Sequence, residues 1–373
     1  MPQALSNLTI IDLSRILAGP FATQNLADMG AKVIKVEHPN GDDTRRWGPP
    51  FVERADGSQD AAYYFCANRN KTNVLLDFTI EADRAQLIAL IKTADVLVEN
   101  DKVGGLKKYG LDYDSIKRIN PAIIYCSITG FGQSGPYKDR PGYDALIQAM
   151  GGLMSITGEA DGAPQKVGVA VVDLMTALYA TTAILAAVNH RHLTGEGQHI
   201  DIALFDVQAA MLANQAASYL LSGQIPTRQG SAHPSIAPYQ PMRVKDGFVM
   251  LAIGNDAQFV QFCSAAGCLG LSKDKRFDSN ENRVAKRNYL EQSLAPFMMA
   301  KTIDQWVALG EQYGFPCGPI NTIDRVLNDT QLLSRDMVVT TQEGYRLVGN
   351  PMKFSATPIT EYQSPPSLEK SNE

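Results

Sequence analysis

Cysteine is scarce in this sequence, with five in 373 residues, at positions 66, 126, 263, 268 and 317. The number is odd and no two are spaced as Cys-x-x-Cys, which disfavours both a disulfide framework and a zinc cluster. The first residues, Met-Pro-Gln-Ala-Leu-Ser-Asn, lack the basic region and apolar core of a secretory signal. These absences predict a protein of the reducing cytoplasm.

The sequence also lacks an excess of positive charge. Lys and Arg total 34 against 39 Asp and Glu, the formal net charge is −5, and there is no long block of one sign. We therefore expect neither nucleic acid nor an anionic membrane as the main partner.

The motifs of three common enzyme classes are missing as well. His190 and His192 are two residues apart, so on a helix they face different sides, and no nearby carboxylate completes a metal-ligand set. There is no Gly-x-Ser-x-Gly elbow of a serine hydrolase. The turn from Asp12 to Pro20 holds one glycine and then proline in place of Gly-x-Gly-x-x-Gly, which argues against a nicotinamide enzyme.

What the sequence does contain is a regular alternation of short apolar runs and helical stretches. This alternation predicts an α/β fold with a parallel sheet that is covered on both faces. Strands are expected at 8–12, 32–37, 73–77, 95–99, 122–127 and 198–203, and helices at 21–29, 81–93, 113–119 and 174–192. Residues 223–239 are rich in Gly, Pro, Ser and Gln, which indicates a linker into a second region. That region has a predicted strand at 247–253 and helices near 256–266, 286–299 and 303–313.

Two polar clusters follow strand ends of the predicted sheet, one at Asp42–Trp47 and one at Asn68–Lys71. Beside Trp47, Tyr63 and Tyr64, their basic residues would suit a ligand that carries phosphates and an aromatic base. They are equally explained as solvated loops with ordinary ion pairs, and composition favours this second interpretation.

Asp173 is the only charged residue between Val167 and Asn189, in an otherwise apolar stretch. Burial of a carboxylate costs several kcal/mol unless donors receive it, so the residue is either a helix cap or a working acid. As a cap, its oxygens would accept the backbone N–H of Met175 or Thr176. A transmembrane helix fits the length, but Asp173, a glycine and three threonines weaken that interpretation.

Taken together, several ordered motifs from residue 5 to about 358 resemble the family III CoA-transferases, the group that includes formyl-CoA and carnitine CoA-transferases. The motifs are Leu-Ala-Gly-Pro-Phe at 17–21, Leu-Ala-Asp-Met-Gly-Ala-Lys-Val-Ile-Lys-Val-Glu at 26–37, Asn-Arg-Asn-Lys at 68–71, Gly-Phe-Gly at 130–132, Thr-Gly-Glu-Gly-Gln at 194–198 and Asn-Pro-Met-Lys-Phe at 350–354.

The resemblance implies covalent catalysis with Asp173 as the nucleophile, through aspartyl anhydride and aspartyl-CoA thioester intermediates. Coenzyme A and acyl-CoA are then substrates, and no permanently bound cofactor or metal is expected. The residues implied at the reacting end are Asp173, Tyr63, Gly230 and His233. Those implied to hold CoA are Ile16, Leu17, His38, Leu76, Asp77, Asn100, Asp101, Lys102, Lys108, Arg140 and Tyr143.

The same resemblance implies a large, doubly wound domain with a parallel sheet, formed by residues 1–222 and 325–373, and a smaller α+β domain at 223–324. It also implies an interlocked homodimer. The sequence departs from the family pattern at Asp101, where relatives usually have an aromatic residue, and after Pro366, where we expect no closing helix.

The nearest alternative activity is that of an α-methylacyl-CoA racemase, which needs an acid and a base on opposite faces of the α-carbon. Relatives with that chemistry have Gly-His-Asp where this chain has Gly142-Tyr143-Asp144, so Tyr143 favours a transferase. A CoA-binding paralogue without activity is the other alternative. The stretches Gly-Ser-Ala-His-Pro-Ser at 230–235 and Pro-Tyr-Gln at 238–240 resemble members that act on small dicarboxylates.

Overall fold

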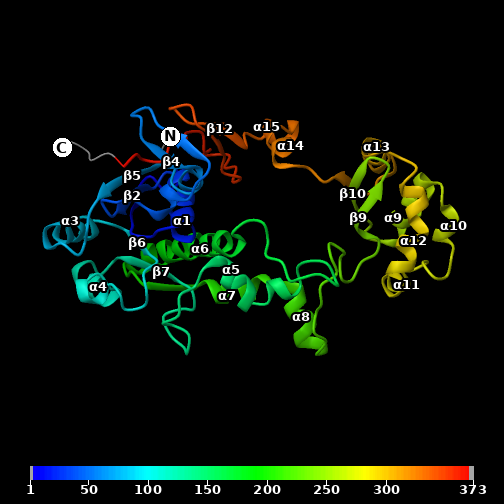
Figure 1. Ribbon diagram of the computed structural model, residues 1–373. Helices are drawn as coiled ribbons and strands as arrows, with labels where there is room; N and C mark the ends of the chain where they lie inside the picture. The colour runs from blue at the N-terminus through cyan, green and yellow to red at the C-terminus, as the bar shows by residue number, and fades with distance from the viewer. Residues whose placement is uncertain (1–2, 369–373) are drawn as a thin grey trace. The chain divides into compact units, whose positions relative to one another are not determined.

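The structure is a computed structural model that describes residues 3–368 of the chain. The chain forms two compact units (Figure 1). The first holds the residues up to 153, residues 166–223 and those from 330 onward, and the second holds 154–165 and 224–329. Residues 154–165 therefore cluster with the second unit, whereas the sequence analysis placed them in the larger domain. The division into two domains, in the functional sense, stays a prediction.

The first unit is built on a six-stranded sheet with the order β5-β2-β1-β6-β7-β8, in which all neighbours are parallel. The strands are β1 (Thr9–Asp12), β2 (Lys32–Glu37), β5 (Lys71–Leu75), β6 (Val96–Glu99), β7 (Ile124–Thr129) and β8 (His199–Ala203). The chain runs outward from β1 through β2 to β5, and then returns to β6 on the other side of β1. The doubly wound parallel sheet expected from the sequence is confirmed.

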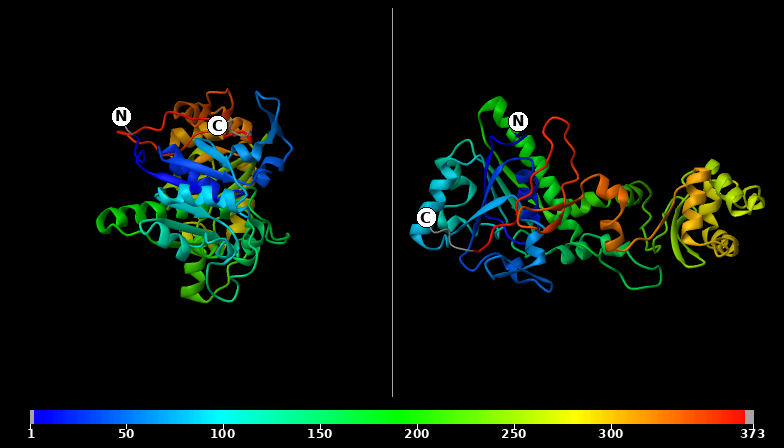
Figure 2. Two further views of the ribbon diagram at one scale, coloured as in Figure 1. Left: turned by 90° about the vertical axis from the view of Figure 1, so that its left-hand side faces the viewer. Right: turned by 90° about the horizontal axis from the view of Figure 1, so that it is seen from above.

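Helices cover both faces of this sheet, as Figures 1 and 2 show. Alternate strand residues point to opposite faces, so Ile10 joins the core under α1 (Ala18–Asp28) and α6 (Val171–Thr194), and Ile11 joins the core under α3 (Glu81–Lys92) and α4 (Tyr113–Ile119). Both strand faces are apolar for this reason, as parallel strands require.

Helix α6 passes for a membrane span by length and composition, and is the only such helix in residues 3–368. In the structure it belongs to the core of the first unit and packs on α1. Small side chains, Ala22 on α1 with Ala177 and Ala180 on α6, are fully buried there, and the Thr181 hydroxyl donates to the Ala22 carbonyl at 3.4 Å. The buried face accounts for part of the apolar sequence of α6, while Leu178, Tyr179 and Leu193 of the same helix are exposed.

The two polar clusters of the sequence contain buried ion pairs as well as an exposed one, Arg46 with Asp43 at 3.0 Å, so the expectation of solvated loops holds only in part. Lys71 Nζ lies 3.0 Å from Asp12 Oδ2, and both side chains are fully buried. Arg45 bonds Glu37 at 2.7 Å, and Arg69 bonds Asp28 at 2.6 Å. These cations are already neutralised, so they are not free to hold phosphates. Buried charges of this kind are tolerated only when they are paired.

The turn after β1 has an isoleucine at a position where a glycine-rich turn would have glycine. Ile16 adopts the left-handed conformation, with φ of 73°, where glycine is usual, and its N–H donates to Asp42 Oδ2 at 3.3 Å. Helix α1 begins at Ala18 rather than after Pro20. A Cβ at Gly19 would lie 2.2 Å from Ser14 Oγ, so only glycine fits at this close approach.

The second unit has its own core and a three-stranded antiparallel sheet with the order β11-β10-β9. Its strands are β9 (Tyr239–Val244), β10 (Gly247–Ala252) and β11 (Cys317–Pro319). The helices are α9 (Asp256–Ala266), α10 (Leu269–Ser272), α11 (Asn280–Ala285), α12 (Arg287–Met298), α13 (Ile303–Tyr313) and α14 (Ile323–Leu327). The buried Trp306 of α13 donates its indole N–H to the Met298 carbonyl at 2.9 Å, which ties two of these helices together.

The remaining elements belong to the first unit, apart from a short 3-10 helix, η3 (Leu153–Ser155), at the boundary. They are η1 (Asp43–Arg46), β3 (Phe51–Glu53), β4 (Gln59–Ala61), α2 (Ala62–Phe65), η2 (Lys107–Tyr109), α5 (Asp144–Met150), α7 (Leu204–Met211), α8 (Ala213–Ser222), α15 (Thr330–Ser334), β12 (Val338–Thr340) and β13 (Arg346–Val348). The expectation about a helix after Pro366 concerns a stretch whose residues 369–373 lie outside the described residues.

Candidate active site

Asp173 is the third residue of α6, and it does not cap that helix. The N-cap is Ala170, and the intrahelical ladder already begins with the Leu174 N–H, which donates to the Ala170 carbonyl at 3.1 Å. The N–H groups of the following residues therefore lie inside the helix and are not free to meet the Asp173 carboxylate. The cap interpretation drawn from the sequence is wrong.

The cap comes instead from Asp144, the first residue of α5. Its Oδ2 accepts the N–H of Val172 at 2.8 Å and the N–H of Asp173 at 3.2 Å. Gln148, fully buried one turn further along α5, donates to Asp144 Oδ1 at 2.5 Å and accepts the Val167 N–H at 2.9 Å. Asp144 and Gln148 thus fix both the start of α6 and the loop that leads into it.

With its helix capped by another residue, the Asp173 carboxylate is left without a hydrogen-bond donor among the described residues. It is half-buried. Burial, and then the neighbouring charge of Asp144, raise the pKa of Asp173 from 3.8 to about 7. A half-buried, unpaired acid that titrates near neutral pH is typical of a functional group rather than a structural one.

The raised pKa of Asp173 predicts that Asp173→Asn stabilises the protein at alkaline pH. The folded-state pKa lies above the value of 3.8 for an exposed aspartate, so the destabilisation grows as pH rises from about 4 to about 7 and is complete above that. We expect the variant to gain about 1 to 4 kcal/mol in the free energy of unfolding at about pH 8. Urea unfolding at about pH 8 and about pH 5.5 measures it, and a gain that does not shrink at the lower pH would contradict the assignment.

Tyr63, on α2, is the second residue of the predicted reacting end, and the structure places it in the electrostatic field of Asp173. Burial, and then the charges of Asp173, Cys66, Asp144 and Asp42, raise the pKa of Tyr63 to about 12. Its phenol therefore stays protonated at neutral pH and can act as a hydrogen-bond donor. The ring also meets Trp47 edge-on, with centroids 5.4 Å apart.

Several of the predicted CoA-binding residues meet at the carboxyl end of the sheet, where four adjacent strands β5, β2, β1 and β6 finish. Asn100, after β6, accepts the Arg15 N–H at 2.9 Å and donates to the Arg15 carbonyl at 2.7 Å, beside Ile16 and Leu17. These bonds join β1 to β6, the point at which the strand order reverses, and open α/β sheets bind ligands in the crevice there.

On the other side of β1, His38 follows β2 and Asp77 follows β5, with Leu76 buried beside it. His38 Nε2 lies 3.5 Å from Asp77 Oδ2, and the hydroxyl and N–H of Thr79 hold the pKa of Asp77 below its usual value. This pair continues the row of predicted residues along the same edge of the sheet.

The other predicted CoA-binding residues are Asp101, Lys102, Lys108, Arg140 and Tyr143. Burial raises the pKa of Asp101, while the guanidinium of Arg15 opposes that shift. Lys102, Lys108, Arg140 and Tyr143 are all exposed. The Lys108 ammonium lies over the ring of its neighbour Tyr109, and the Arg140 guanidinium over the ring of Tyr137, and their role with CoA stays a prediction.

Gly230 and His233 belong to the second unit, whereas Asp173 belongs to the first. The Gly230 N–H donates to the Gly158 carbonyl at 3.0 Å, and Gly230 has a positive φ of 60°. His233 Nδ1 accepts the Ser235 N–H at 3.1 Å, and its ring packs against Tyr239. Both residues shape a turn here, and their place at the reacting end stays a prediction.

Sequence reasoning missed Asp144 and Gln148 as site residues. The only local signal was an acid at the start of a helix, which is common at helix N-termini. The contact with Asp173 joins positions 29 apart. Among residues 3–368, no group of three His, Cys, Asp or Glu side chains is arranged to hold a metal ion.

Comparison with known proteins gives one consistent result. The family model described as CoA-transferase family III matches residues 5–372. The chain is 48% identical to the succinate–glutarate CoA-transferase of Agrobacterium fabrum, over 98% of this chain and 92% of that protein. It is 37% identical to the succinyl-CoA:mesaconate CoA-transferase of Haloarcula hispanica, over 95% of this chain and 91% of that protein.

Among solved structures, the crystal structure of a CaiB/BaiF family protein from Brucella suis matches with a TM-score of 0.91 and 48% identity, and covers 99% of this chain and 97% of that one. The resemblance stated from the sequence motifs is thereby confirmed. A chain with this fold and a family match over nearly its whole length belongs to CoA-transferase family III.

Proposed function

We propose that this enzyme moves CoA between small dicarboxylic acids, with Asp173 as the covalent nucleophile. The observation that supports it most is the Asp173 carboxylate itself, which is half-buried, without a donor, and titrates near pH 7. Relatives named for succinate, glutarate and mesaconate support the substrate class.

The proposed chemistry begins with attack by a carboxylate oxygen of Asp173 on the thioester carbonyl of the donor acyl-CoA. The C–S bond breaks, which gives a mixed aspartyl anhydride and CoA thiolate. The thiolate then attacks the Asp173 carbonyl, forms an aspartyl-CoA thioester and releases the donor acid. An acceptor carboxylate repeats the two steps in reverse, and Asp173 is regenerated without the consumption of water.

The raised pKa of Asp173 supports this role in two ways. A carboxylate with a higher pKa is a stronger nucleophile, and at about pH 7 about half of it is still ionised. Partial burial also keeps water from an anhydride that would otherwise hydrolyse. Tyr63 stays protonated, so its phenol can donate to the oxyanion that develops during each attack.

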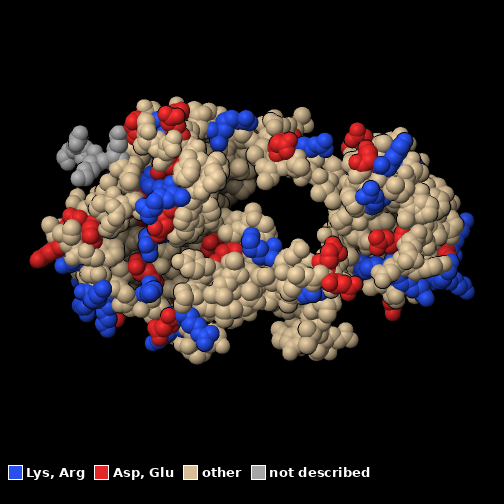
Figure 3. Space-filling view, in the orientation of Figure 1, with Lys and Arg blue, Asp and Glu red and all other residues tan. Residues whose placement is uncertain are grey.

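We further propose that the working form is the interlocked homodimer that the resemblance implies. Helix α8 has no buried residue, and Leu220 and Leu221 on it are 77% and 89% exposed. Its sequence has no charged side chain, and Figure 3 shows no charged residue on its surface. An exposed apolar helix of this kind is typical of an interface.

The five free thiols agree with the proposed cytoplasmic location.

A panel of acyl-CoA donors and carboxylate acceptors tests the substrate class. Succinyl-CoA is incubated with glutarate, mesaconate or oxalate, and in parallel with acetate and butyrate, and the CoA esters are separated by chromatography. We expect exchange with at least one dicarboxylate and much slower exchange with the monocarboxylates. Exchange of an α-proton of an acyl-CoA with deuterated water, without any transfer, would instead identify an isomerase.

A further inference from the structure

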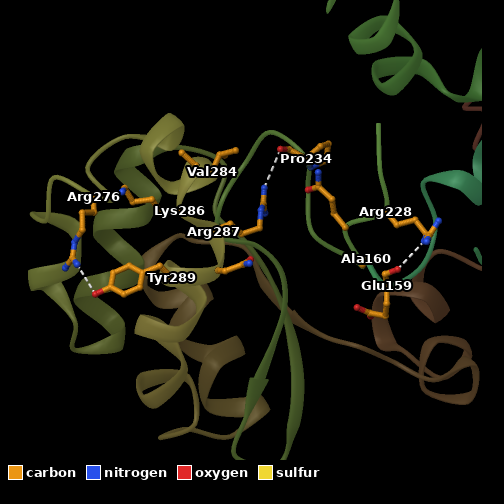
Figure 4. Close-up of a pocket in the computed structure, with 13 residues that line it drawn as sticks. Glu159, Ala160, Arg228, Pro234, Arg276, Val284, Lys286, Arg287 and Tyr289 are labelled. Carbon is orange, nitrogen blue, oxygen red and sulfur yellow. Dashed lines mark hydrogen bonds between the residues drawn. The ribbon is translucent and has the colours of Figure 1, made fainter. Parts of the chain in front are cut away.

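The second unit contains a cavity of about 780 Å³ whose lining includes Gly230, one of the residues implied at the reacting end. All of its lining residues belong to the second unit, so its shape is independent of the first. One wall comes from residues 159–160, 228–230 and 234, and the other from Arg276, the end of α11 and the start of α12 (Figure 4). The volume is within the range of about 300 to 1,000 Å³ that is usual for small-molecule sites.

The lining is strongly basic. Arg228, Arg276, Lys286 and Arg287 face one carboxylate, that of Glu159. Figure 4 shows Arg228 with Glu159 on one side, Arg276 with Tyr289 on the other, and Arg287 between them. Only Arg276 has an anionic partner, Asp274, at 2.5 Å. The other three cations form no salt bridge with any described carboxylate.

The two unpaired arginines are held in place by neutral groups. Arg287 donates to the carbonyls of His233 at 2.5 Å, Ile236 at 3.2 Å and Pro234 at 3.4 Å, and burial lowers its pKa, while the charge of Glu291 opposes that shift. Arg228 donates to the carbonyls of Glu159 at 3.2 Å and Gly162 at 2.9 Å. In both, these bonds leave one guanidinium nitrogen without a partner among the described residues, namely Nε of Arg287 and Nη1 of Arg228.

Carbonyls orient a guanidinium but do not neutralise it, and arginine remains charged in proteins. A partly desolvated cation without a counter-ion is unfavourable, and an anionic ligand relieves that cost. The fold therefore orients the side chains of Arg228 and Arg287 before any ligand binds. Binding then loses less side-chain entropy, which favours it. Beside the charges, Pro234, Val284 and Ala285 give the cavity an apolar wall for a carbon skeleton.

We propose that this cavity is an anion-binding site for a small organic dianion, either a phosphate monoester or a dicarboxylate. Arg228, Lys286 and Arg287 bind the anionic groups, and Glu159 limits the affinity because its charge repels them. The proposal rests on the lining residues of the second unit and not on the role of Asp173, and its test measures binding without acyl-CoA, so its failure is distinguishable from a failure of the proposed function.

The test is calorimetric titration of the full-length, CoA-free protein with inorganic phosphate, AMP and succinate. Lys286 is exposed and its side chain forms no salt bridge with a carboxylate of residues 3–368, so Lys286→Glu changes the charge of the cavity without removing an ion pair. We expect saturable binding of at least one probe, and a loss of about tenfold or more in affinity in Lys286→Glu. Glu159→Gln should bind the same probe more tightly.

Lys273→Glu is the matched control, because Lys273 is an exposed lysine of the same unit that does not line the cavity. Its affinity for the probe should equal that of the wild type. Binding of phosphate and AMP alone would assign a phosphate ester, and binding of succinate alone a dicarboxylate. Saturable binding by none of the probes, or equal affinities in Lys286→Glu, Glu159→Gln and the wild type, would overturn the proposal.

Discussion

Asp173→Asn lowers kcat for CoA transfer by about 10⁴-fold or more, because the amide cannot form the anhydride on which every later step depends. The side chain keeps its size, and the cap of α6 comes from Asp144, so the helix start stays intact. Initial rates with succinyl-CoA and a dicarboxylate acceptor measure the loss. CoA affinity, measured by calorimetry, should change little.

Asp206→Asn is the matched control for this substitution. Asp206 is the third residue of α7, as Asp173 is of α6, but its side chain is exposed. The control therefore removes an acid from the same helical position without removing a reacting group, and it should retain wild-type kcat. If Asp173→Asn kept more than about a tenth of the wild-type rate, Asp173 would not be the nucleophile.

Asp144→Asn has the second largest expected effect, and its direction can be read from the pH profile. The neighbouring charge of Asp144 is one of the two causes that raise the pKa of Asp173, so its removal lowers that pKa. The carboxylate of Asp173 is the reactive form, so activity rises as pH increases through its pKa. We therefore expect the acid limb of the kcat/KM profile to move to lower pH.

The same variant should lose about 10- to 100-fold in kcat, because both backbone bonds that fix the start of α6 are accepted by Asp144 Oδ2 and weaken when its charge is removed, so Asp173 is positioned less well. Gln148→Met separates the two effects. It removes the anchor of Asp144 but leaves its charge, so kcat should fall while the acid limb moves little. An acid limb that stays in place in Asp144→Asn would show that Asp144 does not act on Asp173 electrostatically.

The sequence predicted a strand or helix well where the pattern of its own residues determines its structure. The β-branched run at 32–37 is a buried strand with those bounds, and the helices at 113–119, 256–266 and 303–313 also match. The strands β9 and β11 were missed because each contains proline, which weakens a strand pattern. The short elements α5, α7 and α8 lack a long apolar period to reveal them.

Of the candidate site, the sequence pointed to Asp173 but not to the residues that contact it. Asp173 stands out as the only charge in an apolar stretch, and the family motifs gave it a role. Its partner Asp144 could not be found in the same way, because the two meet only when α5 packs beside α6. The error about the cap has the same origin, since a lone acid near a helix start was assumed to serve its own helix.

The buried cations show the limit of composition most clearly. Arg45, Arg69 and Lys71 lie in polar stretches that are typical of the surface. Their partners Glu37, Asp28 and Asp12 lie at the ends of other strands and helices, and the parallel sheet brings them together. Which charges become buried pairs is therefore decided by topology, which a pass along one segment does not show.

The most direct test of the central claim is to trap the covalent intermediate on Asp173. The protein is mixed with succinyl-CoA in the absence of an acceptor, treated with hydroxylamine and digested with trypsin. Cleavage after Lys166 and Arg191 releases a peptide, 167–191, in which Asp173 is the only acidic side chain. A hydroxamate on this peptide, absent in Asp173→Asn, is the result that the proposed mechanism predicts; active transfer with no label there, or with the label on another peptide, would contradict it.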